Sequence, residues 1–66
     1  MATRIVETGE VVERLSVAQY LALVAQLEFP RGRDYVVQSI AAGDAGARFM
    51  VYGGAIRKGL IERVRG

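Results

Sequence analysis

The sequence has 66 residues and contains neither cysteine nor histidine, which excludes disulfides, thiol nucleophiles and histidine-based zinc sites. Nine basic and seven acidic residues leave a net charge of only +2, while apolar residues make up 52% of the chain. Because no apolar run approaches the ~18 residues of a membrane span and MATRIVETGE lacks a signal-peptide pattern, we expect one cytoplasmic domain over 1–66, without membrane contact.

The first fifteen residues predict a β-hairpin. Both flanks of Thr8-Gly9 are rich in β-branched residues, and this dipeptide is a candidate two-residue turn. The hairpin would place Ile5 opposite Val12, with the glutamates at 7, 10 and 13 on the solvent side. A helix beginning near Thr8 is the alternative, and the helix cap that follows argues against it.

Residues 16–27 predict an amphipathic helix. Ser16 can cap it, and Gln19 three residues later completes a capping box. Leucines, valines and Tyr20 recur at helical spacing along one side. The small side chains on the other side would let a second copy or partner approach closely, and they are Ala18, Ala22 and Ala25.

The second half of the chain predicts strands. Residues 34–41 and 47–52 are rich in β-branched and aromatic residues, AGDAG between them favours a turn, and Gly53-Gly54 is a second hairpin signal. The pattern of 55–64 fits a strand or a helix. The expected fold is therefore α+β: an N-terminal hairpin, one central helix and an antiparallel β-meander. The expected core is Leu21, Val24, Leu27, Val36, Ile40, Val51 and Leu60.

An alternative comes from residues 39–64, which resemble a winged helix-turn-helix. Small residues match the positions around the turn, Tyr52 and Ala55 match packing positions of the recognition helix, and GLIERV matches the start of the wing. The resemblance implies that Gly53-Gly54 lies inside a helix and that this helix enters the DNA major groove. The small residues concerned are Ala41, Ala42, Ala45, Gly46 and Ala47.

The string Pro30-Arg31-Gly32-Arg33 resembles the core of an AT-hook, Pro-Arg-Gly-Arg-Pro, and departs from it at Asp34. The resemblance implies an extended segment whose arginines enter the minor groove of AT-rich DNA. The competing interpretation, which we prefer, is a connection between helix and strand with solvated or paired arginines.

Catalysis is not expected. Histidine and cysteine are absent, Lys58 is the only lysine, and a chain of this size leaves little volume for a substrate pocket. The glycine-rich GDAG at 43–46 lacks the spacing of a phosphate-binding loop, and Asp44 alone cannot hold a metal. We therefore expect no enzyme activity, cofactor, metal or small-molecule substrate.

Two functions remain, and the modest charge favours the first. The first is protein–protein interaction as an inhibitor, adaptor or assembly subunit of the kind a phage or mobile element encodes, acting as a homodimer or with an obligate protein partner. Its expected interface is Ala18, Ala22, Ala25, Tyr35, Phe49 and Tyr52. The alternative is a small nucleic-acid-binding regulator. Its expected contacts are Arg31, Arg33, Arg48, Arg57, Lys58, Arg63 and Arg65.

Overall fold

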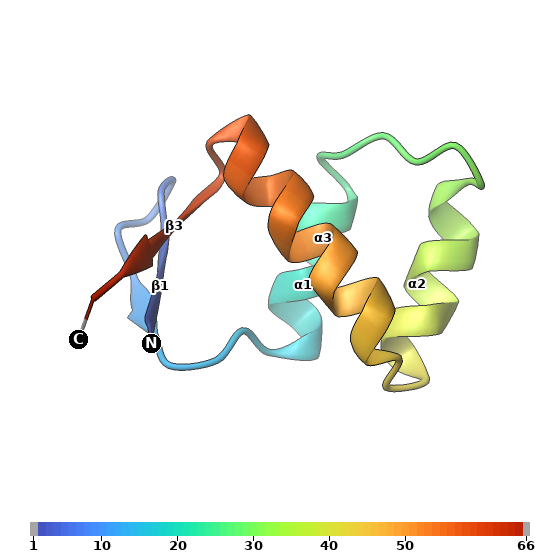
Figure 1. Ribbon diagram of the computed structural model, residues 1–66, viewed down its shortest axis with the longest axis horizontal. Coiled ribbons are helices and arrows are strands. Elements are labelled where there is room, and N and C mark those ends of the chain that lie inside the picture. The colour runs from blue at the N-terminus through green and yellow to red at the C-terminus, as the bar shows by residue number, and fades with distance from the viewer. Residues whose placement is uncertain (1, 66) are drawn as a thin grey trace.

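The computed structural model describes residues 2–65 and combines a small sheet with three helices. The sheet lies at one end of the molecule and the helices extend away from it (Figure 1). Its strand order is β2-β1-β3, with both pairs antiparallel. The predicted α+β class is confirmed. The elements are β1 (Ala2–Ile5), β2 (Val11–Val12), α1 (Val17–Val24), α2 (Arg33–Ala41), α3 (Ala45–Lys58) and β3 (Ile61–Val64).

The N-terminal hairpin is confirmed, but its predicted turn and pairing are wrong. Thr3, not Ile5, lies opposite Val12. The connection spans residues 6–10 instead of two residues, with Gly9 at φ +75°. Thr8 turns the chain with its side chain, because its Oγ1 accepts a hydrogen bond from the Glu10 amide at 3.2 Å. A Thr-Gly pair therefore forms part of a longer loop here.

Helix α1 begins as predicted. The Gln19 amide donates to Ser16 Oγ at 3.1 Å and the Ser16 amide donates to Gln19 Oε1 at 2.8 Å, which completes the capping box. The regular helix ends at Val24, three residues before Leu27. Arg33 binds two carbonyls there, with Nε 3.2 Å from the Val24 oxygen, which also accepts from the Leu27 amide, and Nη2 3.2 Å from the Leu27 oxygen.

The strands predicted over 34–41 and 47–52 are wrong, because both segments are helical. A helix places residues four apart on one side, and this spacing buries Val36 with Ile40 and Val51 with Ala55. Asp44 starts α3, since its Oδ1 accepts from the amides of Gly46 and Ala47 at 2.8 and 3.2 Å. Burial and capping together outweigh a strand preference that amounts to ~1 kcal/mol or less per residue.

The predicted Gly53-Gly54 hairpin is also wrong, because both glycines lie inside α3. The helix ends at Lys58 and is capped by Gly59, whose φ of +80° suits glycine. The Leu60 amide then donates back to the Ala55 carbonyl at 2.9 Å, which closes the last turn. Residues 55–64 are therefore helix first and strand afterwards, which answers the choice that the sequence left open.

Helices α2 and α3 lie where the winged helix-turn-helix resemblance requires helices. The three residues 42–44 join them, with Gly43 at φ +85°. The chain departs from the resemblance after α3, where β3 pairs with β1 from the other end of the sequence. The strand that follows α3 therefore completes the N-terminal sheet and does not open a hairpin of its own.

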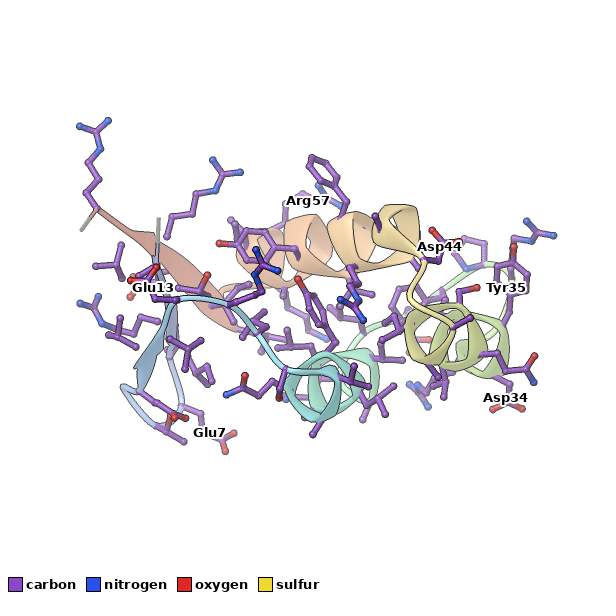
Figure 2. All side chains as sticks on the ribbon, turned by 90° about the horizontal axis from the view of Figure 1, so that it is seen from below. Glu7, Glu13, Asp34, Tyr35, Asp44 and Arg57 are labelled. Atoms are coloured by element: carbon purple, nitrogen blue, oxygen red, sulfur yellow. The ribbon has the colours of Figure 1, made fainter. Side chains whose placement is uncertain are left out.

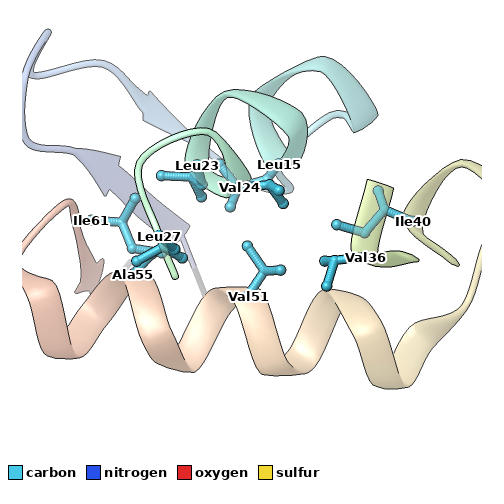
Figure 3. Packing of buried hydrophobic residues seen from close by; sticks show 9 residues of the cluster. All are labelled: Leu15, Leu23, Val24, Leu27, Val36, Ile40, Val51, Ala55 and Ile61. Carbon is cyan, nitrogen blue, oxygen red and sulfur yellow. The ribbon is translucent and has the colours of Figure 1, made fainter. Parts of the chain in front are cut away.

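The core lies between α1, α2, α3 and the inner face of the sheet (Figure 3). Five predicted core residues are buried, and the other two, Leu21 and Leu60, pack partly buried against them. The buried residues of this cluster that were not predicted are Leu15, Leu23, Ala55 and Ile61, and Ala2 and Thr3 of β1 are also buried. Within 2–65, no helix combines the length and the hydropathy that crossing a bilayer would need.

Candidate interaction surfaces

The outer side of α3 carries exposed apolar side chains. Phe49 is 80% exposed and Met50 46% exposed, and Gly46 precedes them by one turn. Tyr35 on α2 is 49% exposed. A small protein rarely leaves large apolar side chains adjacent on one helix in water, and such clusters mark contact surfaces. We call Gly46, Phe49 and Met50 the α3 outer face.

A shallow cleft adjoins the α3 outer face. It has a volume of about 260 Å³ and lies between the loop after α1 and the first turns of α2 and α3. Arg31 lies over the Tyr35 ring on its rim, with Cζ 4.4 Å from the ring centroid. Asp44 also borders the cleft, and Figure 2 shows Tyr35 and Asp44 at the same end of the molecule. The apolar lining comes mainly from Phe29, Pro30, Tyr35, Ala47 and Met50.

A second cleft of about 320 Å³ lies between the N-terminal hairpin and α1. Val6, Leu15 and Leu60 supply apolar lining, and Gln19 and Gln26 supply amides. Ala22 also lines this cleft, whereas Ala18 and Ala25 are simply exposed. The predicted alanine surface of α1 is therefore accessible, and Ala25 caps the helix end instead of lying within it.

The predicted nucleic-acid contacts do not form one patch. Arg33 is engaged with the end of α1, and Gly32 before it is the N-cap of α2, so the AT-hook-like string is not a free extended segment. Arg31 lies at the cleft. Lys58 and Arg57 lie in the last turn of α3, far along the helix from the cleft. Lys58 Nζ donates to the Gln26 carbonyl at 2.7 Å, and Arg57 is exposed. Arg65 follows β3 and is exposed.

Two of the predicted arginines instead alternate with tyrosines across three elements. Arg48 Cζ lies 5.8 Å from the Tyr20 ring centroid, and Arg63 Cζ lies 6.0 Å from that of Tyr52. Arg48 and Tyr52 are four residues apart on α3 and so share a side of it. We call Tyr20, Arg48, Tyr52 and Arg63 the Arg–Tyr ladder. Thr3 fixes it to the sheet through a 2.8 Å hydrogen bond between Thr3 Oγ1 and the Tyr52 hydroxyl.

The predicted interface residues thus fall on separate surfaces. Tyr35 and Phe49 belong to the cleft and the α3 outer face, whereas Tyr52 belongs to the ladder. Sequence reasoning missed Tyr20 as a partner of Arg48. The four-residue spacing of Arg48 and Tyr52 was the available signal that these two side chains share a surface. It is informative only if 47–52 is taken as helix.

Within residues 2–65 no group of three or more acidic, histidine or cysteine side chains is placed to hold a metal ion. No protein-family model, curated protein or solved structure matches the chain. The surfaces described above are therefore the basis for a functional assignment.

Proposed function

We propose that this chain is a non-catalytic protein-interaction module whose α3 outer face and adjoining cleft bind a second copy of the chain. The observation that carries the proposal is Phe49, which is 80% exposed and directly precedes Met50, a lining residue of the apolar cleft of about 260 Å³. Covering this side chain removes apolar surface from water on both copies, which favours association.

A second copy fits this surface because a two-fold interface must be complementary to itself. One face supplies both a projecting aromatic ring, Phe49, and a recess beside it lined by Phe29 and Tyr35. The rim supplies both charges, Arg31 and Asp44. A two-fold rotation can therefore place each Phe49 in the other copy's cleft and each Arg31 near the other copy's Asp44.

The size of the chain is compatible with such a dimer. A standard interface buries ~800 Å² on each partner. The described chain exposes 4596 Å², so an interface of that size would use roughly a sixth of its surface. A chain of 66 residues without disulfides has a small core, and association would add to its stability.

Reading of duplex DNA by α3 has weaker support, although the helix-turn-helix geometry favours it. Base edges are read by hydrogen-bonding side chains such as arginine, asparagine and glutamine. The exposed positions in the first two turns of α3 offer none, because they are Ala45, Gly46, Phe49 and Met50. This face suits an apolar protein surface better than a groove of DNA. The cytoplasmic location stays a prediction.

Light scattering after size exclusion tests the proposal over roughly 10 μM to 1 mM protein, which covers weak and moderate affinities. The 7.2 kDa chain should elute as a dimer, twice that mass. Phe49→Ser should give a monomer without loss of fold, because the side chain is exposed. Val11→Ser is the matched control, since Val11 is 49% exposed on β2, away from this face.

Two outcomes would contradict the proposal. One is a wild-type chain that stays monomeric throughout the concentration series. The other is a dimer whose dissociation constant is the same in Phe49→Ser as in the wild type. Arg31→Glu adds a further check, because it places two like charges across the interface beside Asp44 and should weaken the dimer without affecting the monomer fold.

A further inference from the structure

We propose that the Arg–Tyr ladder binds single-stranded nucleic acid, with phosphates on its guanidinium groups and unpaired bases on its rings. The arginine of the ladder on α3 lies away from Met50, because one residue step turns a helix by about 100° and places Arg48 and Met50 on opposite sides of Phe49. Tyr52 follows Phe49 by three residues, so the ladder borders the α3 outer face. Phe49→Ser, which removes the proposed dimer contact, therefore belongs in the test of the ladder.

The guanidinium groups of the ladder lie near tyrosine rings, at 5.8 Å for Arg48 and 6.0 Å for Arg63, which is the outer range of a cation–π contact. Such a contact uses no N–H hydrogen bond, so the N–H groups can still donate to a phosphate. Across residues 2–65 the ion pair is Arg4–Glu62, at 3.1 Å, which involves neither ladder arginine. The nearby Asp44 carboxylate already accepts from two amides at the start of α3. Arg48 and Arg63 are thus available for an external anion.

Arg48 also has an unmet donor. Its Nε is buried, and no group within residues 2–65 accepts a hydrogen bond from it. A buried donor without an acceptor lowers stability, whereas a charge-assisted bond to a phosphate is among the strong hydrogen bonds. A small outward movement of the side chain towards a phosphate oxygen would satisfy Nε, so ligand binding would relieve an unfavourable feature of the free protein.

The tyrosines favour a single strand over a duplex. Tyr20 and Tyr52 are partly exposed, and Thr3 holds the Tyr52 hydroxyl at 2.8 Å, which fixes the ring. An immobilised ring is a stacking platform for an unpaired base, while the bases of a duplex are already stacked on one another. Alternation of aromatic and basic side chains is typical of proteins that bind single strands without sequence preference.

Fluorescence anisotropy with a labelled oligothymidine of about 12 nucleotides tests this proposal, since that length suits a small binding site. If each ladder arginine neutralises one phosphate, the slope of log affinity against log salt should be about −1.4, at 0.7 per phosphate. Arg63→Gln should reduce the slope by about 0.7. Arg57→Gln is the matched control, because Arg57 is an exposed arginine of α3 that belongs neither to the ladder nor to the proposed dimer surface.

The rings are tested separately. Tyr52→Leu should weaken binding about fivefold or more and leave the salt slope unchanged, because stacking is lost and charge is kept. Tyr52→Phe keeps the ring but loses the Thr3 hydrogen bond, so it should bind more tightly than Tyr52→Leu and no more tightly than the wild type. Far-UV circular dichroism of each variant shows that loss of binding does not follow from unfolding.

Several results would overturn the proposal. They are no anisotropy change at low salt, equal losses in Arg63→Gln and Arg57→Gln, or a duplex that binds as tightly as the single strand. Phe49→Ser keeps this test independent of the dimer, because it leaves the ladder arginines and tyrosines unchanged and should bind the single strand at the ladder. Dimerisation and nucleic-acid binding can thus fail separately.

Discussion

Replacing Gly53 and Gly54 by alanine should stabilise the protein, because both positions lie in the interior of α3. Alanine is favoured over glycine there by about 0.8–1.0 kcal/mol per residue. A Cβ built on Gly53 would lie 3.5 Å from Arg57 Nη1, the end of a flexible side chain. A Cβ on Gly54 would lie 3.6 Å from Leu27 Cδ1, an ordinary van der Waals contact. Neither substitution meets a steric barrier.

The double variant should therefore gain about 2 kcal/mol in the free energy of unfolding. For a domain of this size that corresponds to a rise of about 8–16 °C in the melting temperature. Thermal unfolding followed by circular dichroism at 222 nm measures the change and reports the helix content directly. The wild type and the double variant should be measured at the same protein concentration, because self-association also raises the melting temperature.

Gly59→Ala is the control, because this glycine ends α3 at φ +80°. An alanine forced into that left-handed conformation should lower stability by about 1–2 kcal/mol. If the Gly53-Gly54 variant were destabilised instead, these residues would occupy a turn with positive φ, and the assignment of α3 would be wrong. A gain in the free energy of unfolding at Gly53-Gly54 together with a loss at Gly59 distinguishes a helix interior from a hairpin turn.

Two further substitutions test the capping and the core. Asp44→Ala should lower the free energy of unfolding in urea by about 1–2 kcal/mol, because it leaves the amides of Gly46 and Ala47 without their acceptor. Asp44→Asn keeps an acceptor and should change the free energy of unfolding little. A loss of equal size in both variants would show that charge, not capping, is responsible. Val51→Ala should lower stability by about 2–3 kcal/mol, because the side chain is fully buried, while Val11→Ala at 49% exposure should stay within about 0.5 kcal/mol. Similar losses at positions 51 and 11 would contradict the core described above.

The candidate surfaces were only partly predictable from the sequence. Phe49 and Tyr35 were expected at an interface, but the cleft beside them forms only when the loop after α1 packs against two helices. Arg33 was expected to contact a partner, and the fold instead uses it on the carbonyls of α1. Whether an arginine is free depends on which carbonyls and rings the fold brings near it, and sequence spacing does not report that.

The sequence by itself determined the local features. Ser16 and Gln19 are three residues apart and complete their capping box without help from the rest of the chain. The N-terminal hairpin likewise follows from two β-branched segments separated by a short polar loop. Five of the predicted core positions are correct as well, because large apolar side chains are buried in either type of element.

Only the tertiary structure decided that 34–41 and 47–52 are helices and that the last strand joins the first. A strand over 47–52 would have needed cover on both faces, whereas a helix buries Val51 and Ala55 on one side and leaves Phe49 outside. The pairing of Ala2 with Val64 joins the two ends of the chain. Intrinsic preferences of up to ~1 kcal/mol per residue yield to burial of this kind, and only contacts between residues distant in sequence decide it.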